Sequence, residues 1–396
     1  MESMNASRPR SASAPGFGRG TRIVQIVRQY TPSRGGLEDV VSNLSRSLVE
    51  RGFAVRVVTL DRLFQAPDVA LPTSETIDGV EVVRIPWRGS SRYPVAPDVF
   101  RHIADADLVH VHGIDFFYDA LAWSRPFHRK PLIATTHGGF FHTKNYAAIK
   151  KLWFGTATRA SGWGYDALVC CSQSDLRMFE PIAGAKVRLI ENGVDIGKFA
   201  GLASEVPVRR MVTIGRFSVN KRLDRLIETM AALRDLAPGW QLDIIGSPSD
   251  QTEADLRGAI AARGLENVIR LHVGIGNDEV RKVLARSSLF VSASEYEGFG
   301  LVAVEAMSAG LVPVLHGNEA YQALAARHQG VVVTDFSRPD LAASAIEAAF
   351  QRLSSSPVLR AQMISGASQH GWDGVCDQHV ALYREVLGPR LQEAFA

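Results

Sequence analysis

The stretch TRIVQIVRQYTPSRGGLED, residues 21–39, shows how the ordered part of this chain begins. TRIVQIVR is a short apolar run typical of a buried strand, and the pair Gly35 and Gly36 predicts a turn. We expect a helix next, because apolar residues recur at the spacing of one helical face, at Val41, Leu44 and Leu48. FAVRVVTL (53–60) then predicts a second strand, so the segment forms a strand–helix–strand unit of a parallel sheet.

The same pattern begins again near the middle of the chain. RMVTIGRFSVNK (210–221) predicts another strand and loop, and further strands alternate with helices beyond it. A chain of 396 residues is also too long for one core. We therefore expect an α/β protein with two Rossmann-like, doubly wound domains that face each other across a cleft. The loops at the carboxyl ends of the strands should carry the function. Residues 1–20 form a tail, 21–195 the first domain and 196–375 the second.

Composition excludes several classes of protein. The chain is 46% hydrophobic and 21% charged, which is typical of a folded protein, and a net charge of +3 gives no reason to expect a nucleic-acid partner. No apolar run is long enough to span a bilayer, and the first 20 residues lack the apolar segment of a signal peptide. The three cysteines lack a C-x-x-C pair and indicate buried thiols in a reducing cytoplasm.

Charge is unevenly distributed along the chain. The first 200 residues hold 25 Lys and Arg against 19 Asp and Glu, whereas the rest holds 19 against 22. A mildly basic first half suits an anionic partner or an anionic membrane surface. Ordinary scatter of charge explains the difference about as well.

Two loops offer groups that bind phosphate. Gly35 and Gly36 precede a helix, where the backbone can approach an anion and the helix N-terminus supplies unpaired amides, although a tight turn explains two glycines equally well. Arg216 and Lys221, in GRFSVNK, follow a strand of the second domain. Such a pair suits a diphosphate, since Arg binds it through two hydrogen bonds and Lys through a mobile charge. A solvated loop with two cations is the alternative.

The stretch EYEGFGLVAVEAM (295–307) places carboxylates at both ends of a loop and helix. EYEGFG predicts the loop and LVAVEAMSAG a helix ended by glycine, so the amides of Phe299, Gly300 and Leu301 should be free donors. Glu297 precedes these amides, and Glu305 lies roughly 8 Å further along the helix axis. That offset suits a sugar nucleotide, which carries hydroxyls on two rings with phosphates between them. Taken alone, either Glu is better explained as a cap or a surface residue.

Three histidines lie in two short motifs of the first domain, and His142 follows the second motif. His110 and His112, in HVHG, share one strand face, which makes a metal site conceivable. No further ligands occur at suitable spacing, so we expect none. His137, in THGG, ends a strand, where active-site residues of such sheets are found. A lone histidine there would more often be structural, but together with the other loops a functional role is favoured.

Together these motifs resemble glycosyltransferase family 4, whose members are retaining enzymes with the GT-B fold. The similarity rests on the Glu297-to-Glu305 motif, on GRFSVNKRLD (215–224), on ENGVD (191–195) and on the segment from Pro32 to Glu38, and it covers about residues 21–390. HVHGIDFFYDALA and TTHGGFFHTKNYA are most similar to the α-mannosyltransferases of acetan and xanthan assembly. Those enzymes transfer mannose from GDP-mannose to a cellobiosyl diphosphate polyprenol.

The resemblance implies a role for each candidate residue. Glu297 and the amides of Phe299, Gly300 and Leu301 would hold the donor sugar, and Glu305 the ribose. Arg216 and Lys221 would hold the diphosphate, with Gly35 and Gly36 beside it. His137 would lie at the reaction centre, and Ser172 would line the cleft as a donor-binding residue. The family needs no metal or other cofactor for catalysis, and the C-terminal helix, residues 376–396, would pack back on the first domain.

A lipid-linked acceptor also implies an approach to the membrane. We expect the enzyme at the cytoplasmic face of the inner membrane, held peripherally. The segment 144–166 mixes cations with aromatic residues in the manner of an interfacial surface, at Lys150, Lys151, Trp153 and Phe154. A helix with a buried aromatic face is the alternative.

Three other functions remain as alternatives. A different GT-B glycosyltransferase would use a UDP-sugar, a GT-B epimerase would isomerise the nucleotide sugar, and a sugar-nucleotide sensor would bind it without turnover. A nicotinamide enzyme is disfavoured, because the chain lacks the G-x-G-x-x-G fingerprint.

Overall fold

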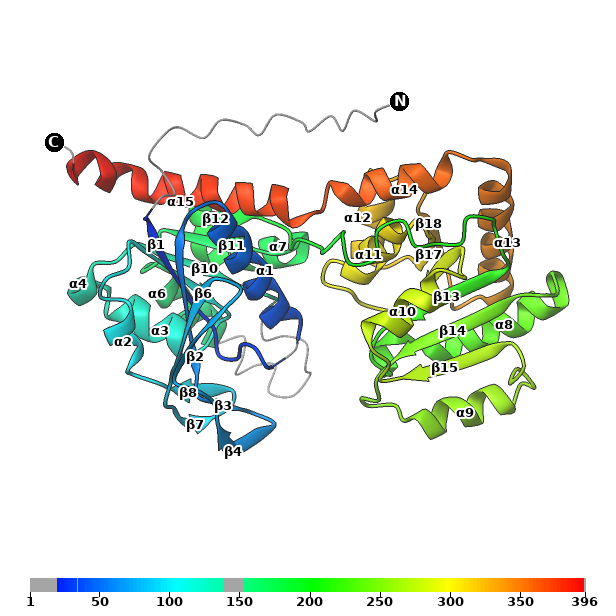
Figure 1. Ribbon diagram of the computed structural model, residues 1–396, viewed down its shortest axis with the longest axis horizontal. Coiled ribbons are helices and arrows are strands. Elements are labelled where there is room, and N and C mark those ends of the chain that lie inside the picture. Colours follow the sequence, from blue (N-terminus) through cyan, green and yellow to red (C-terminus); the bar gives the residue numbers. More distant parts are fainter. Residues whose placement is uncertain (1–19, 34, 139–152, 395–396) are drawn as a thin grey trace, which may run out of the picture. The chain divides into compact units, whose positions relative to one another are not determined.

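The structure is a computed structural model that describes residues 20–33, 35–138 and 153–394, the side chains of 389–394 excepted. The chain divides into two compact units. The first extends to Ile190 and resumes at Cys376, and the second comprises Glu191–Val375 (Figure 1). The cysteines at 170, 171 and 376 are buried thiols.

An eight-stranded sheet forms the centre of the first unit, in the order β12-β11-β10-β9-β1-β2-β6-β5. All neighbours are parallel except β5 and β6. The strands are β1 (Arg22–Ile26), β2 (Ala54–Leu60), β5 (Ser74–Ile77), β6 (Val80–Ile85), β9 (Leu108–His112), β10 (Leu132–Thr135), β11 (Ala167–Cys170) and β12 (Val187–Leu189). Two antiparallel ribbons join β3 (Arg62–Leu63) to β4 (Ala66–Ala70) and β7 (Arg88–Ser90) to β8 (Tyr93–Val95).

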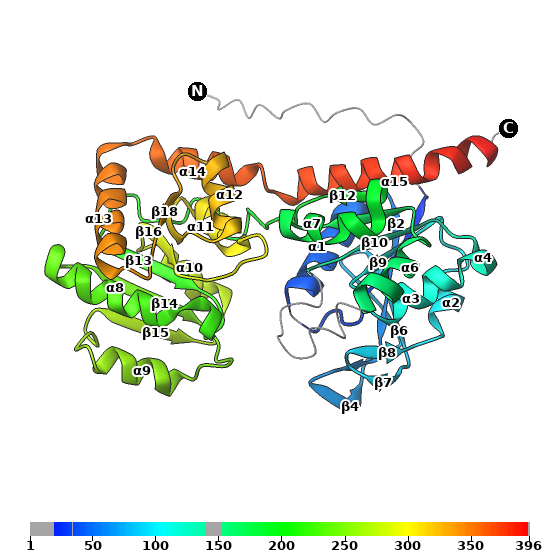
Figure 2. The same ribbon diagram turned by 180° about the vertical axis from the view of Figure 1, so that it is seen from behind.

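Helices of the first unit connect these strands. They are α1 (Gly36–Glu50), α2 (Val99–His102), α3 (Phe116–Trp123), α4 (Arg125–His128), the π-helical turn η2 (Phe154–Thr158), α6 (Arg159–Gly162), α7 (Gln173–Ala183) and the 3-10 turn η3 (Gly184–Lys186). The long helix α15 (Trp372–Ala394) begins in the second unit and continues into the first. Helix α3 packs against α4 and α6 (Figures 1 and 2). The expected apolar face of α1 is confirmed, because Val41, Leu44 and Leu48 are fully buried.

A six-stranded parallel sheet forms the centre of the second unit, in the order β15-β14-β13-β16-β17-β18. The strands are β13 (Arg210–Ile214), β14 (Gln241–Gly246), β15 (Ile269–Val273), β16 (Leu289–Ser292), β17 (Val312–His316) and β18 (Val332–Thr334). The helices are α8 (Leu223–Leu236), α9 (Glu253–Ala261), α10 (Asn277–Leu284), α11 (Leu301–Ala309), α12 (Glu319–Arg327), α13 (Pro339–Ser355) and α14 (Leu359–Ser368), with a 3-10 turn η4 (Val219–Lys221).

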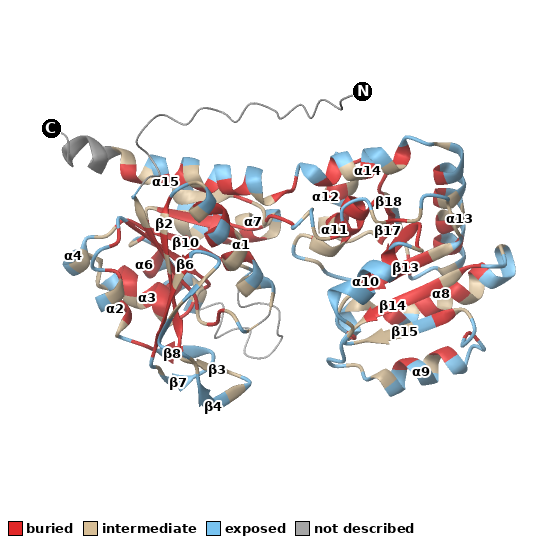
Figure 3. Cartoon of the chain, viewed as in Figure 1, coloured by how far each residue is buried: buried red, intermediate tan, exposed pale blue. Residues whose placement is uncertain are grey.

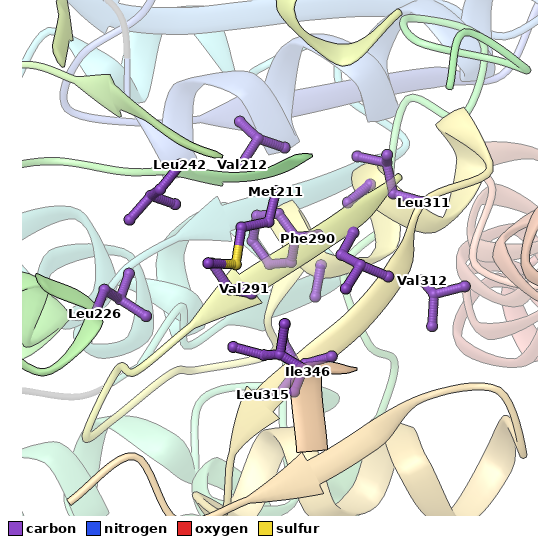
Figure 4. Packing of buried hydrophobic residues seen from close by; sticks show 14 of the residues in the cluster. Met211, Val212, Leu226, Leu242, Phe290, Val291, Leu311, Val312, Leu315 and Ile346 are labelled. Carbon is purple, nitrogen blue, oxygen red and sulfur yellow. The ribbon is translucent and has the colours of Figure 1, made fainter. Parts of the chain in front are cut away.

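Burial on both faces explains the apolar strands of both sheets. The strands of both units are mostly buried in Figure 3, as parallel sheets covered by helices require. In the second unit, side chains from neighbouring strands interdigitate with α8 and α13, and Met211, Phe290 and Ile346 lie close together there (Figure 4).

Both units follow the same winding order. In the second sheet the strands run 3-2-1-4-5-6 when numbered along the chain. The parallel strands of the first sheet, read from β6 towards β12, begin in the same order. The predicted α/β class with two doubly wound domains is therefore confirmed. The order reverses between β1 and β9 in the first unit and between β13 and β16 in the second. Ligands of such sheets bind at these switch points.

One packing contact of the first unit gives a direct test of the fold. A Cβ added at Gly164 would lie 2.8 Å from Cα of Ala122 and 2.9 Å from its carbonyl oxygen, which are backbone atoms that cannot rotate away. We expect Gly164→Ala to lower the free energy of unfolding by about 1–3 kcal/mol, measured by urea titration. Gly155→Ala is the control, because nothing lies within 4 Å of its Cβ position. Equal stability of the two variants would contradict the packing.

Candidate active site

The loop after β13 depends on close backbone packing. A Cβ at Gly246 would lie 1.9 Å from the carbonyl oxygen of Gly215, so only glycine lets the ends of β13 and β14 approach this closely. A Cβ at Gly215 would lie 2.9 Å from Cε of Lys221, which shows that the lysine side chain crosses over this glycine. Phe217 is fully buried and anchors the loop. Lys221 is thereby held over the switch point rather than extended into solvent.

Lys221 and Glu297 meet at that switch point. Lys221 Nζ lies 2.6 Å from Glu297 Oε1, and each side chain is only about one-fifth exposed. The hydroxyl of Tyr321 donates to the same carboxylate oxygen at 3.2 Å, and Ser292 Oγ lies 3.0 Å from that hydroxyl. Burial and the nearby Glu297 charge raise the pKa of Tyr321 well above its usual value, so it remains a hydrogen-bond donor. The carboxylate therefore has two fixed donors and a fixed orientation.

Asn220 ties the two loops together. Its Nδ2 donates to the carbonyl of Tyr296 at 2.9 Å, and its Oδ1 accepts from the amide of Tyr296 at 3.1 Å. The backbone carbonyl of Asn220 accepts from the amide of Glu295 at 3.0 Å. These three bonds hold the loop that carries Lys221 beside the loop that carries Glu297. Sequence reasoning missed Asn220 and Tyr321, because neither stands in a pattern that predicts its partner.

Helix α11 begins at Leu301 and ends at Ala309, as predicted. Gly300 precedes it with a φ of 81°, and a Cβ there would lie 2.8 Å from the Tyr321 ring, so both conformation and space require glycine. Within the described chain, the amides of Phe299, Gly300 and Leu301 donate no hydrogen bond. They are unpaired donors next to Glu297, and they carry the partial positive charge of a helix N-terminus.

The remaining candidates of the second unit differ in their surroundings. Glu305 is 19% exposed, with Lys198 Nζ 3.4 Å from its Oε1 and that ammonium 4.7 Å from the centre of the Phe199 ring. Lys198 is a neighbour that the sequence did not identify. Arg216 is exposed, and among the described residues its guanidinium forms no ion pair. It therefore remains available to an anion, whereas Lys221 is already paired with Glu297.

His137 lies just after β10 at the carboxyl edge of the first sheet. Its φ is 53°, an unfavourable backbone conformation for a residue with a side chain. Asp175 holds the loop in this conformation, accepting from the amide of Gly138 at 3.1 Å and from the hydroxyl of Thr136. Ser172 accepts from the amide of Asp175 at 3.2 Å and caps α7. Ser172, predicted to bind the donor, thus also helps to position His137.

His137 belongs to a cluster of neutral histidines. Its Nε2 lies 2.9 Å from Nδ1 of His112, whose ring is fully buried with that of His110. Burial lowers the pKa of His137 to about 3 and lowers the pKa values of His110 and His112 well below their usual range. The cluster brings no positive charge to this edge of the sheet near neutral pH. Both ring nitrogens of His110 and of His112 are already engaged by protein partners.

The predicted glycine pair opens α1. Gly35 is its N-cap, and a Cβ there would lie 2.5 Å from Glu38 Oε2, whereas a Cβ at Gly36 would meet nothing within 4 Å. Glu38 also accepts from Ser33 Oγ at 3.4 Å. The φ of Gly35 is −176°, which suits any residue, and the Glu38 carboxylate can move away from a Cβ there, so the turn does not require this glycine. Gly36 leaves space in front of the helix.

Part of the predicted membrane segment lies outside the described residues, including Lys150 and Lys151. Trp153 is 47% exposed, while Phe154 packs edge-on against Phe179 with ring centres 5.0 Å apart. Phe154 thus contributes to the core and Trp153 to the surface. The described residues contain no cluster of three metal-binding side chains, and none of their helices is long and apolar enough to cross a membrane.

The neutral histidines make stability depend on pH in a defined direction. An unfolded His binds a proton below about pH 6.5, whereas the folded cluster does not, so the free energy of unfolding falls as pH drops below that value. Each such His contributes a slope of up to about 1.4 kcal/mol per pH unit. We expect His137→Asn to reduce the slope measured by urea titrations between about pH 5 and 6.5. An unchanged slope would contradict a His137 that is neutral in the folded protein.

Known families and proteins match nearly the whole length of this chain. A family model described as "Glycosyltransferase Family 4" matches residues 34–198, and one described as "Glycosyl transferases group 1" matches residues 199–370. A GDP-mannose:cellobiosyl-diphosphopolyprenol alpha-mannosyltransferase of Komagataeibacter xylinus is 43% identical over 94% of this chain and 95% of its own length. One of Xanthomonas campestris is 41% identical over 94% and 99%.

Solved structures show the same fold. A sucrose-phosphate synthase from Thermosynechococcus elongatus has a TM-score of 0.71 at 18% identity, covering 93% of this chain and 100% of its own. The Anabaena protein HepE, in complex with UDP and glucose, has a TM-score of 0.69 at 18% identity, covering 92% and 100%. The predicted GT-B fold is thereby confirmed.

Proposed function

This chain belongs to glycosyltransferase family 4, and we propose that it transfers mannose from GDP-mannose to cellobiosyl-diphosphopolyprenol with retention of the anomeric configuration. It is a hexosyltransferase by family. The donor and acceptor follow from relatives that match nearly its whole length at 41–43% identity. The reaction fits the assembly of an exopolysaccharide of the acetan or xanthan type.

The observation that carries the proposal is the arrangement of Lys221, Glu297 and the unpaired amides of α11 at one switch point. A nucleoside-diphosphate sugar has a dianionic bridge between two rings that bear hydroxyls. Lys221, Arg216 and the amides suit the bridge, while Glu297 suits the hydroxyls of the sugar and Glu305 those of the ribose. Gly36 suits the close approach of the first unit's backbone to the phosphates.

Leaving-group stabilisation is the main catalytic contribution in this scheme. Negative charge on GDP grows as the glycosidic bond breaks, so fixed cations and amides stabilise the transition state more than the bound donor. Tyr321 and Asn220 act indirectly, since they fix Glu297 and the two loops before substrate arrives. Lys221 and Arg216 supply positive charge from the protein itself, and the proposed reaction requires no metal.

Retention is proposed to proceed by attack of the acceptor hydroxyl on the face that GDP leaves. The departing phosphate oxygen takes the hydroxyl proton, and His137 lies near the sugar. Glu297 is a poor candidate for a covalent nucleophile, because its Oε1 is already engaged by Lys221 and Tyr321. Its proposed role is to orient the sugar.

A test of donor and site uses a panel of labelled nucleotide sugars with lipid-linked cellobiosyl diphosphate. We expect label to enter the organic phase from GDP-mannose and not from UDP-glucose or UDP-mannose. Glu297→Gln keeps the size of the side chain but loses its charge, and should reduce kcat by about 10²-fold or more. Glu295→Gln is the matched control, because that exposed carboxylate on the same loop pairs with Arg222 and Arg225 instead.

Transfer from a UDP-sugar would show that GDP-mannose is not the donor. A fully active Glu297→Gln enzyme would show that Glu297 has no role in the reaction. Binding of GDP-mannose without turnover would favour a sensor, and isomerisation of the sugar nucleotide an epimerase.

A polyprenol acceptor requires the enzyme to reach the cytoplasmic membrane surface, and we propose a peripheral contact through the segment 144–166. Exposed Trp153 supports this contact, and Lys150 and Lys151 would add charge attraction. We expect the double substitution Lys150→Glu with Lys151→Glu to reduce co-sedimentation with vesicles containing anionic lipid, while turnover on a soluble acceptor analogue stays unchanged. Equal co-sedimentation of the two proteins would rule out this surface.

A further inference from the structure

A buried chain of hydrogen bonds runs from His137 into the core of the first unit. His137 Nε2 lies 2.9 Å from His112 Nδ1, and His112 Nε2 lies 2.6 Å from Gln25 Oε1. On its other side, His137 Nδ1 lies 3.9 Å from the sulfur of Cys171, which is near the limit for a hydrogen bond to sulfur. His137 stands at the carboxyl edge of the sheet, while Gln25 is in β1 and His112 in β9, on either side of the switch point.

The chain continues from Gln25 to helix α15. Gln25 Nε2 donates to the hydroxyl of Tyr383 at 3.4 Å, and that hydroxyl lies 2.7 Å from His110 Nδ1. His110 Nε2 lies 2.7 Å from Thr135 Oγ1. The side chains of Gln25, His110 and Tyr383 are fully buried, so water does not compete for these bonds.

The amide of Gln25 fixes which group donates and which accepts in each hydrogen bond of this series. Its oxygen can only accept, so His112 must carry its proton on Nε2 and leave Nδ1 as an acceptor. His137 must then donate from Nε2, which leaves its own Nδ1 with a lone pair. At the other end, the amide nitrogen of Gln25 can only donate. Tyr383 accepts this bond and donates its own O–H to Nδ1 of His110, whose Nε2–H donates in turn to Thr135.

We infer that Gln25 and His112 are positioning residues that hold His137 as the Nε2–H tautomer, with its Nδ1 presented as a hydrogen-bond acceptor. This inference rests on the proposed function, in which His137 lies at the reaction centre. There the Nδ1 lone pair accepts a hydrogen bond from a substrate hydroxyl, replacing the long contact with Cys171. An imidazolium at 137, or the other tautomer, would present a donor to that hydroxyl instead and would lose the contact.

Among the described residues, the groups that shift the pKa values of these histidines favour neutral imidazoles. Besides His110 and His112 on β9, the groups packed here are His379, Tyr383 and Cys376 from α15 and Cys171 beyond β11. His379 lowers the pKa of His137 further by repulsion, and burial raises the pKa of Tyr383. Apart from Asp175, which accepts from Thr136 and Gly138 on the His137 loop, none of the groups named is a carboxylic acid. A carboxylate placed among these groups should therefore raise the pKa values of the imidazoles beside it.

Nitrogen-15 NMR of histidine-labelled wild-type protein tests the tautomer directly. We expect the Nε2 atoms of His112 and His137 in the protonated range and their Nδ1 atoms in the unprotonated range, unchanged between about pH 5.5 and 8, because neither ring gains a proton there. Assignment uses His112→Gln and His137→Gln. A protonated Nδ1 on His137 near neutral pH would overturn the inference by itself.

Two substitutions at Gln25 test the functional consequence. Gln25→Met keeps the length and removes the amide, and should lower kcat on the order of 10- to 100-fold, the usual cost of losing a partner that orients a functional His. The KM for the donor should change little. Gln25→Glu offers His112 a carboxylate that stabilises its charged form, so kcat should gain an acidic limb, falling as pH decreases between about 7 and 5.

The control is His328→Asn, which breaks a similar buried contact in the second unit, where His328 Nε2 lies 2.9 Å from His370 Nε2. It should lower stability without an acidic limb in kcat. If the folded Gln25 variants keep the wild-type kcat and pH profile while His137→Ala is inactive, the relay is wrong and the proposed function stands. If wild-type protein transfers no sugar, the proposed function fails, and the NMR result still decides the relay.

Discussion

The ion pair between Lys221 and Glu297 is the constraint on which the candidate site depends. It forms because β13 and β16 are neighbours at the point where the strand order reverses, so their following loops meet at one edge of the sheet. Glycines at 215, 246 and 300 permit the close approaches, and Asn220 ties the loops by three hydrogen bonds. The ammonium and carboxylate are thus fixed before any ligand binds, which reduces the reorganisation that binding and catalysis would require.

In the first unit, the candidate residue His137 is held by a different means. Here no ion pair fixes His137, and a directional chain of neutral groups does so instead. Buried neutral hydrogen bonds avoid the cost of desolvating charge, but each member must keep its tautomer for the next bond to form. Asp175 adds a separate restraint on the backbone of the same loop. The C-terminal helix takes part through Tyr383, so the last segment of the chain helps to fix a residue far earlier in the sequence.

The sequence predicted the parts of the site that local patterns determine. Strand, glycine and helix signals gave both doubly wound sheets and the limits of α11, and strand order then brings the loops of Lys221 and Glu297 together. Tyr321, Lys198 and Asn220 were missed, because their contacts depend on side-chain packing between segments far apart in the chain. His110 and His112 were correctly placed on one strand face. Their partners Gln25 and Tyr383 could not be predicted, since the contact between positions 25 and 383 has no local signature.

Calorimetric binding of GDP and GMP to wild-type and Lys221→Met proteins tests the central claim, that this site binds a diphosphate through fixed positive charge. Loss of one charge-assisted hydrogen bond costs about 1.5–3 kcal/mol. The account therefore predicts that the substitution weakens GDP binding on the order of 10-fold or more, while GMP affinity changes little. Equal affinities of the two proteins for GDP, or an equal loss for GMP, would contradict it.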